Sequence, residues 1–175
     1  MCHDFHKGKS FTFSMHCKHN FPAHKEKSDW DIELQNGMKD EEYLRILSNS
    51  LDNLEQEHNG KVDFIFYQSG VDVMEGDRLG LLALSPQGVL KRDQMVAEFA
   101  ERMSLHDSKF SSTHVKQRTI PMMSMMGGGY ILNEKGNPVE RVAQAHAQTV
   151  NVLRNHWILE ENSYSGHIKR GSEIY

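Results

Sequence analysis

The sequence of 175 residues contains only two cysteines and four prolines and has no excess of basic charge. Two cysteines, Cys2 and Cys17, are too few for the disulfide framework of a small secreted domain, so a reducing compartment is expected. The formal net charge of −4 provides no basic footprint for nucleic acid. Composition therefore excludes a disulfide scaffold and predicts no direct nucleic-acid partner.

Long apolar stretches are also missing. No segment approaches the ~20 consecutive apolar residues of a membrane-spanning helix, and the first residues lack the apolar core of a signal peptide. We therefore expect a soluble intracellular protein, with no nuclear-localisation cluster to decide between nucleus and cytoplasm. A hydrophobic fraction of 38% and a charged fraction of 25% suit one globular domain.

Two apolar runs that end at glycines predict a parallel sheet. Residues 62–68 and 120–126 have the pattern of fully buried strands, and glycine-marked corners follow both. Such runs, joined by a long helical crossover, are typical of neighbouring parallel strands. Ligands bind beyond the carboxyl ends of such strands. Asp72 and Tyr130 follow these two ends, so we expect them to share one cleft.

Shorter strands and the domain limits follow from the remaining pattern. Residues 10–16 and 30–34 alternate apolar with polar side chains, which predicts two strands with one wet face each. We expect a disordered polar leader over 1–9, one partial domain over 10–158 and a loose polar tail over 159–175.

Three helices are predicted from their apolar stripes and end signals. The first runs from Asp40, as its cap, to His58 and ends at Asn59-Gly60. The second begins at Ser85-Pro86, with serine as the cap and proline at the first helical position. The third begins with a capping-box pattern at Asn137 and ends near His156.

Several ordered segments resemble the second half of the zinc-dependent histone deacetylase domain, and most closely its class IV and bacterial deacetylase-like branches. In chain order these segments are 11–16, 20–22, 40–44, 70–80, 84–88 and the corner 127–130 with the sequence Gly-Gly-Gly-Tyr. The resemblance implies an α/β fold, namely the carboxyl-terminal portion of the arginase/deacetylase-type parallel sheet with helices on both faces.

The resemblance also implies a reaction, the zinc-dependent hydrolysis of acetyl-lysine or a related acylated amine by a metal-activated water. It assigns Asp72 as a ligand of Zn²⁺ and Tyr130 as the phenol that donates to the oxyanion. The residue chemistry agrees, because carboxylate oxygens bind zinc and hydroxyl donors stabilise oxyanions. The alternatives are a turn aspartate and a tyrosine that packs on its loop.

Other residues match positions that contact substrate or ions in the family. Phe21 matches an aromatic that lines the acyl-lysine tunnel, and Leu79 matches a hydrophobic position at the tunnel rim. A loop aromatic and an ordinary core leucine are the alternatives. Gly128 and Gly129 match glycines that let the substrate approach the backbone, although a tight turn would use the same residues. The partner implied is an acetylated protein or a small acylated amine.

Ser14 and Met15 match a strand end that helps to hold a structural K⁺ ion in relatives, and a plain strand end fits them equally well. Asp77 and Arg78 are expected to shape their loop through hydrogen bonds. The methionines of 120–126 suit a buried strand better than a soft-metal site.

Two further segments receive no functional assignment. The cysteines and histidines near the amino terminus match no zinc pattern; they are Cys2, His3, His6, His16, Cys17 and His19. Residues 104–118 form an insertion of unknown role relative to the family.

The family's Asp-x-His ligand motif and His-His pair are both missing upstream of the strand at 10–16. One carboxylate cannot replace the three protein ligands of a catalytic zinc. We therefore predict a truncated domain that binds zinc poorly, is inactive alone and self-associates through its open sheet. The alternative is a non-catalytic remnant that serves as a binding or regulatory module.

Overall fold

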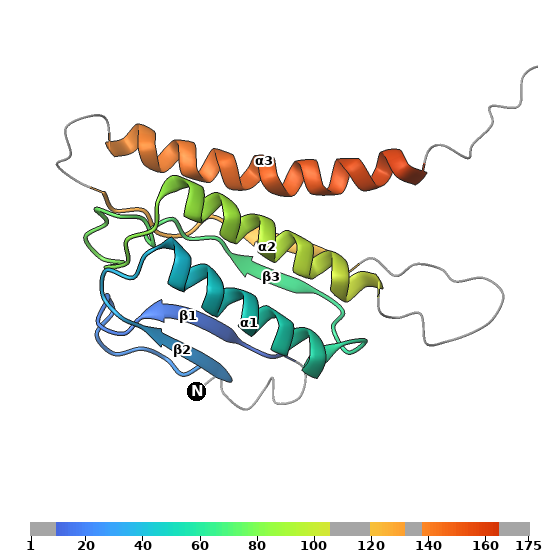
Figure 1. Ribbon diagram of the computed structural model, residues 1–175, viewed down its shortest axis with the longest axis horizontal. Coiled ribbons are helices and arrows are strands. Elements are labelled where there is room, and N and C mark those ends of the chain that lie inside the picture. Colours follow the sequence, from blue (N-terminus) through green and yellow to red (C-terminus); the bar gives the residue numbers. More distant parts are fainter. Residues whose placement is uncertain (1–9, 106–119, 132–137, 165–175) are drawn as a thin grey trace, which may run out of the picture.

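The computed structural model describes residues 10–105, 120–131 and 138–164 (Figure 1). These ranges form short parallel strands and long helices. In chain order the elements are β1 (Phe13–Cys17), β2 (Trp30–Leu34), α1 (Asp40–His58), β3 (Ile65–Gln68), α2 (Pro86–Leu105), β4 (Met122–Met125) and α3 (Pro138–Tyr164).

The strands of the described ranges form two separate parallel pairs. β1 pairs with β2 in the register Phe13 to Trp30, and β3 pairs with β4 in the register Ile65 to Met122. The predicted α/β class with parallel strands is therefore confirmed. The strand predicted at 30–34 has the predicted bounds, whereas the first strand begins three residues later than predicted and extends to Cys17.

The prediction that 62–68 and 120–126 form fully buried strands is wrong. Tyr67 faces α2, where its hydroxyl donates to Asp93 at 2.5 Å. Because alternate residues of a strand point to opposite faces, Phe66 and its register partner Met123 share the other face. These side chains are 67% and 50% exposed. Within the described residues, no element covers that face.

Helix α1 has the predicted bounds, but Asp40 does not cap it. The N-cap is Lys39, which makes no side-chain cap bond, and Asn59 is the C-cap with Gly60 at φ 70°. The Asp40 carboxylate instead accepts hydrogen bonds from the Ser85 backbone N at 2.8 Å and hydroxyl at 2.5 Å. Because this contact crosses 45 positions, the local pattern could not reveal it.

Helix α2 begins as predicted, and α3 is longer than predicted. The Ser85 hydroxyl accepts a hydrogen bond from the Gly88 N at 3.0 Å, which confirms the serine cap. Helix α3 continues to Tyr164, beyond the predicted end near His156 and into the predicted tail, because no glycine or proline stops it before Gly166. None of the described helices combines the length and hydropathy needed to cross a bilayer.

Several predicted segments lie outside the described residues. They are the leader 1–9, Asn137 of the predicted capping box, residues 165–175 of the tail, and most of the 104–118 insertion, whose first two residues belong to the end of α2.

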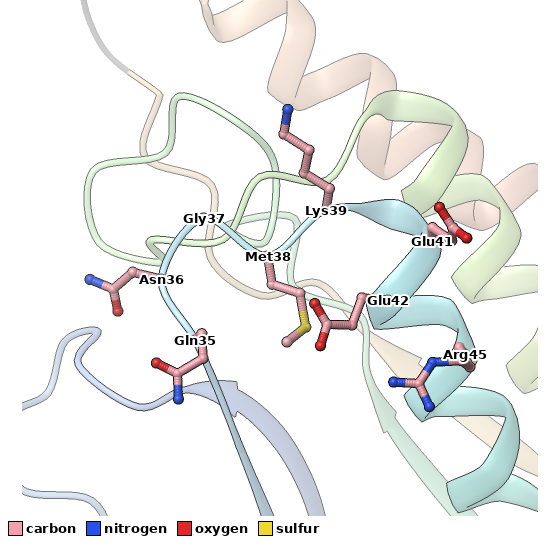
Figure 2. A pocket seen from close by; sticks show the side chains of 8 residues that line it. All are labelled: Gln35, Asn36, Gly37, Met38, Lys39, Glu41, Glu42 and Arg45. Carbon is pink, nitrogen blue, oxygen red and sulfur yellow. The ribbon is translucent and has the colours of Figure 1, made fainter.

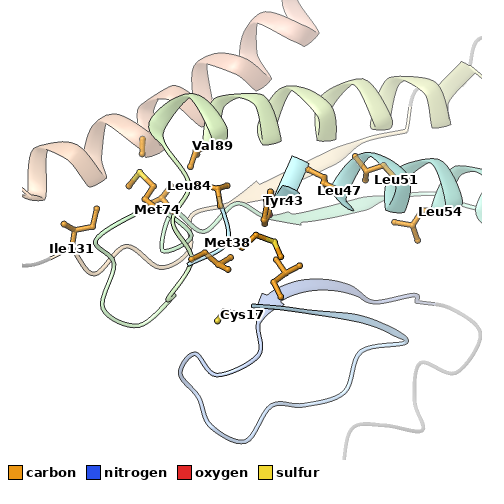
Figure 3. Close-up of a cluster of buried hydrophobic side chains, with 14 residues drawn as sticks. Cys17, Met38, Tyr43, Leu47, Leu51, Leu54, Met74, Leu84, Val89 and Ile131 are labelled. Atoms are coloured by element: carbon orange, nitrogen blue, oxygen red, sulfur yellow. The ribbon is translucent and has the colours of Figure 1, made fainter. Parts of the chain in front are cut away.

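Helix α1 is central to the hydrophobic core (Figure 3). Its buried stripe packs into one cluster with both the β1–β2 pair and the loop that follows β3. The fully or nearly fully buried members of this cluster are Cys17, Leu34, Met38, Tyr43, Leu47, Leu51, Leu54, Val71, Met74, Leu82, Leu84, Val89, Ile131 and Ala145. One helix therefore links the β1–β2 pair to the loop that follows β3.

Truncation of this stripe should destabilise the whole fold. Leu51 is 5% exposed, so we expect Leu51→Ala to lower the free energy of unfolding by about 2–5 kcal/mol. The matched control is Gln56→Ala on the exposed face of the same helix, which should change it by less than ~0.5 kcal/mol. Urea denaturation followed by circular dichroism measures both, and equal effects of the two variants would contradict the core assignment.

Candidate functional site

The corners that follow β3 and β4 lie side by side. The Val71 N donates to the Gly128 O at 2.8 Å, and the Ser69 N donates to the Met125 O at 3.0 Å. A Cβ on Gly127 would stand 2.7 Å from the Cα of Gly70, so this approach tolerates no side chain there. The pairing of β3 with β4 therefore continues into the loops.

Asp72 and Tyr130 flank the same glycine. A Cβ on Gly128 would stand within 3.0 Å of both the Asp72 carboxylate and Cε2 of Tyr130. A Cβ on Gly70 would stand 2.9 Å from Oδ1 of Asp72. The two glycines thus leave the space in which the carboxylate and the phenol ring, expected to share one cleft, come together.

The carboxylate of Asp77 ties the two corners to each other. It is 6% exposed, and its Oδ1 accepts from the N–H groups of Leu79 and Gly80, both at 2.8 Å. Its Oδ2 accepts from the Tyr130 N at 2.5 Å. The loop-shaping bonds of Asp77 were expected, but the bond to Tyr130 across 53 positions was not. Asp77 therefore fixes the main chain from which the Tyr130 ring projects.

Asp72 lies in an environment that disfavours its charge. Burial raises the pKa of its carboxyl, and the nearby charge of Asp77 raises it further, while Arg92 and His146 act in the opposite direction. His146 lies on α3, and its Nδ1 is buried without a hydrogen-bond partner among the described residues. The corner therefore favours the neutral form of the Asp72 carboxyl.

A buried ion pair in α2 supports the corner that follows β3, and the sequence analysis did not predict it. Arg92 and Asp93 of α2 are 4% and 0% exposed. The Arg92 Nη1 donates to the Gly70 O at 2.6 Å, and its Nε donates to Asp93 at 2.9 Å. Asp93 also accepts from the hydroxyls of Tyr67 at 2.5 Å and Thr149 at 2.6 Å. This network connects β3, α2 and α3 with the corner that contains Asp72.

Phe21 and Leu79, the expected tunnel residues, are joined through the backbone. The Phe21 N donates to the Leu79 O at 3.2 Å, in a loop that contains the cis Phe21-Pro22 bond. The Phe21 ring is 70% exposed, and Leu79 is half-buried. Because Leu79 also donates to Asp77, the loop after β1 meets the same turn that holds Tyr130.

Gly129 occupies a packing position rather than an open one. A Cβ there would stand 2.7 Å from Cγ1 of Val142 in α3 and 2.9 Å from Cγ2 of Val71. Its lack of a side chain therefore lets α3 approach the loop that follows β3.

The remaining expected residues lie elsewhere. Ser14 and Met15 are on β1, where the Ser14 hydroxyl is 2.8 Å from Nδ1 of His16. Cys17 is fully buried, and its thiol donates to the Asn36 side-chain oxygen at 3.1 Å. Of the amino-terminal cysteines and histidines, Cys2, His3 and His6 are outside the described residues.

The described residues do not fit a catalytic zinc by themselves. Over the described ranges, no group of three or more histidine, cysteine, aspartate or glutamate side chains is placed to hold a metal ion. Both oxygens of Asp77 already accept N–H groups, which leaves Asp72 as the carboxylate available at the corner. Three protein ligands are required at such a site.

A pocket elsewhere on the molecule carries none of this chemistry. It has a volume of 570 Å³ and lies at the connection between β2 and α1 (Figure 2). Its lining residues are Gln35, Asn36, Gly37, Met38, Lys39, Glu41, Glu42 and Arg45. None of the site residues expected from the sequence lies in it, so the candidate site remains the corner at Asp72 and Tyr130.

Comparison with known sequences identifies similar proteins. The histone deacetylase domain family matches residues 1–149 of the chain. An uncharacterized protein of Picosynechococcus sp. is 37% identical over 123 residues, which cover 70% of this chain and 35% of that protein. Histone deacetylase 2 of Arabidopsis thaliana is 31% identical over 103 residues, or 59% of this chain and 22% of that protein.

Solved structures share the fold at low identity. A histone deacetylase homolog from Aquifex aeolicus superposes with a TM-score of 0.55 and 22% identity, over 82% of this chain and 35% of that one. A histone deacetylase homolog complexed with SAHA gives a TM-score of 0.52 at 22% identity, over 83% and 35%. The fold is thus the arginase/deacetylase type, and the chain spans only 35% of the length of these two structures.

The electrostatics of the corner predict that replacing its two aspartates by asparagine has opposite effects on stability. The raised pKa of Asp72 means that the folded carboxyl ionises less readily than the unfolded one. Its contribution to stability is therefore present below the unfolded pKa and lost as pH rises through the folded pKa. We expect Asp72→Asn to raise the Tm at pH 7, and the gain to vanish as the solution is acidified below the ordinary carboxyl pKa.

The matched variant is Asp77→Asn, which replaces one of the two carboxylate oxygens that accept the N–H groups of Leu79, Gly80 and Tyr130 with an amide NH₂ group that cannot accept them. It should lower the free energy of unfolding at pH 7 by about 1–3 kcal/mol. Thermal denaturation of both variants at pH 3 and pH 7 is the measurement. A decrease in Tm for Asp72→Asn at pH 7 would show that the carboxylate is stabilised by its surroundings, contrary to this account.

Proposed function

Because the chain belongs to the histone deacetylase domain family, we propose that the corner at Asp72 and Tyr130 is the part of a deacetylase active site that meets the acyl group. The substrate class is an acetylated lysine or a related small acylated amine. The observation that carries this proposal is the convergence of the Asp72 carboxylate and the Tyr130 ring on Gly128.

Tyr130 is proposed as the catalytic hydrogen-bond donor. Amide hydrolysis places negative charge on the carbonyl oxygen, and a donor that is already in position stabilises it. The Tyr130 side chain is 48% exposed, so it can reach a bound ligand, while Asp77 holds its main-chain N in place. Gly128 lets the Asp72 carboxylate and the Tyr130 ring approach the same point, since a Cβ there would meet both.

Asp72 is proposed as one ligand of Zn²⁺ in a complete domain. Its carboxylate is an oxygen ligand of the kind that zinc binds. Burial raises the pKa of this carboxyl, and the charge of Asp77 raises it further. The described residues alone do not fit the ion, so the other ligands and the general base are assigned to parts of a deacetylase domain that the described residues do not contain.

Phe21 and Leu79 are proposed as walls for the alkyl stem of the acylated amine. The exposed ring of Phe21 and the half-buried Leu79 lie on adjoining loops. An apolar pair suits a chain of methylene groups because its burial removes apolar area from water. Gly129 supports this corner by admitting α3, and Ser14 and Met15 remain proposed ligands of K⁺ in the complete domain.

The chain is further proposed to represent the carboxyl-terminal part of a class IV or bacterial-type deacetylase domain, resident in the nucleus or cytoplasm. The sequence segments from 11–16 to the Gly-Gly-Gly-Tyr corner support this assignment.

A chimaera tests the assignment of Tyr130. The part of the Arabidopsis histone deacetylase 2 domain that corresponds to residues 1–149, the range that matches the family, is replaced by those residues of this chain. We expect the chimaera to release acetate from an acetyl-lysine peptide, and Tyr130→Phe to lower its kcat roughly 10²–10³-fold by removing the hydroxyl donor.

Tyr67→Phe in the same chimaera is the control. Its hydroxyl donates to Asp93 in the buried supporting network and not at the corner itself, so its loss should reduce stability more than kcat. Circular dichroism confirms that each variant is folded. A folded chimaera whose kcat is the same with and without the Tyr130 hydroxyl would refute the role.

The 175-residue chain alone should behave differently. We expect no saturable zinc binding by calorimetry and no acetate release with added zinc, because one carboxylate does not make a zinc site. Arabidopsis histone deacetylase 2 is assayed alongside as the positive control. Turnover by the isolated chain at a rate comparable to that enzyme would overturn the prediction.

The described residues contain no group of three metal-ligating side chains, and this also favours a second function, a non-catalytic binding or regulatory module. In that case the chimaera would fold and remain inactive, whereas a truncated enzyme gives an active chimaera.

A further inference from the structure

The loop between β1 and β2 folds around the ammonium group of Lys25. The Nζ of Lys25 donates to three backbone carbonyl oxygens of the segment 18–22. The acceptors are the carbonyls of Asn20 at 2.9 Å and of Lys18 and Pro22, both at 3.1 Å. Because an ammonium group has three N–H donors, these carbonyls satisfy it completely. We call the three oxygens and the Nζ that they surround the Lys25 cage.

The charge of Lys25 is met by backbone dipoles. Within the described residues this half-buried side chain makes no ion pair with a carboxylate. Backbone carbonyls gathered around a compact cation are also the arrangement that binds monovalent cations in selectivity filters. Hydrogen bonds from a charged donor are stronger than neutral ones. Lys25 therefore supplies from within the chain the cation around which this loop is ordered.

Apolar burial does not hold the loop in place. Residues 21–24 are exposed, and the Phe21 side chain is 70% exposed. The Asn20 N donates to the Cys17 O at 3.4 Å, and the Phe21 N donates to the Leu79 O at 3.2 Å. Both bonds are longer than the usual value of about 2.9–3.0 Å. The Lys25 cage is therefore the main constraint on the segment that carries Phe21.

The cage lies on both sides of Phe21. Two of its three carbonyls belong to Asn20 and Pro22, the neighbours of Phe21 in the chain. The Phe21 N bonds to Leu79, on the turn that adjoins the candidate site. Figure 1 shows the loop between β1 and β2 at the same end of the molecule as the loop that follows β3. The position of Phe21 beside that turn therefore depends on Lys25.

From these contacts we propose that Lys25 is a positioning residue of the candidate site, a built-in cation that holds the loop 18–22 and keeps Phe21 against the Leu79 turn. Lysine suits this role because a compact ammonium can point its donors at converging carbonyls, whereas a guanidinium is a planar fork. The fold of the loop around Lys25 does not depend on the proposed function. Its consequence for substrate binding rests on that function, because it acts through Phe21 as an apolar wall.

Lys25→Met tests the cage in the 175-residue chain. The substitution keeps an unbranched stem and removes all three donors. We expect backbone amide exchange at Phe21 to become at least about tenfold faster, because its bond to Leu79 opens when the loop is released. The Trp30 amide, which bonds β2 to Thr12, should change by less than about twofold. Amide exchange at single-residue resolution measures both.

Lys27→Met is the matched control. Lys27 is exposed and has no hydrogen bond or ion pair within the described part of the chain, so the variant removes the same charge without touching the cage. Exchange at Phe21 should stay within about twofold of the unmodified chain. Circular dichroism establishes that each variant is folded, and Lys25→Gln, which is also uncharged, replaces Lys25→Met if that variant unfolds. Unchanged exchange at Phe21 without the ammonium, or equal effects at both lysines, would overturn the proposal.

The chimaera with Arabidopsis histone deacetylase 2 tests the consequence for substrate. Lys25→Met should raise the KM for an acetyl-lysine peptide by about fivefold and change kcat by less than about twofold, because an apolar wall binds the stem equally in the ground state and the transition state. Phe21→Ala should raise the KM at least as much. The double variant should match Phe21→Ala alone, because Lys25 acts through Phe21.

The two measurements separate failure of this proposal from failure of the proposed function. Additive increases in KM for the two substitutions would show that Lys25 acts independently of Phe21 and would overturn the positioning role. An inactive chimaera would contradict the proposed deacetylase activity instead. The exchange rates of the isolated chain would then still decide whether Lys25 holds the loop.

Discussion

The candidate site depends on the buried carboxylate of Asp77. This one side chain accepts N–H groups from its own turn and from Tyr130, so it fixes two corners that are far apart in the sequence. The Leu79 carbonyl extends the link to Phe21. Burial raises the pKa of Asp72, and the negative charge of Asp77 in this network raises it further. Two acids in one corner repel each other, so the contacts of Asp77 hold an arrangement that disfavours the charge of Asp72.

Much of the fold could be predicted because periodicity is local information. The apolar stripe and the end signals of 40–58 gave the bounds of α1, and the alternation at 30–34 gave β2. Burial could not be predicted in the same way, because Phe66 has the same side chain whether or not another element covers it. The role of Asp40 was misread since its partner, Ser85, lies on a distant segment.

The site residues likewise divide into those that the local sequence predicts and those whose role depends on contacts between distant segments. Asp72 and Tyr130 could be located because both follow strand ends, where parallel sheets gather their loops. The support beneath them could not, because the bonds of Arg92 to Gly70 and of Asp93 to Thr149 connect separate elements. One signal was present in the sequence. An adjacent acid and base within the buried stripe of α2 are too costly to bury unless they are paired and hydrogen-bonded.

The contacts that shape the corner and the edges that remain open belong to different parts of the chain. The bonds that position Asp72 and Tyr130 lie among β3, β4, α2, α3 and their loops, and the free edge of β3 faces the other way. The corner is therefore formed by contacts on one side of β3. Since these contacts already organise Tyr130, a bound ligand does not have to order it, and this lowers the ordering cost of binding.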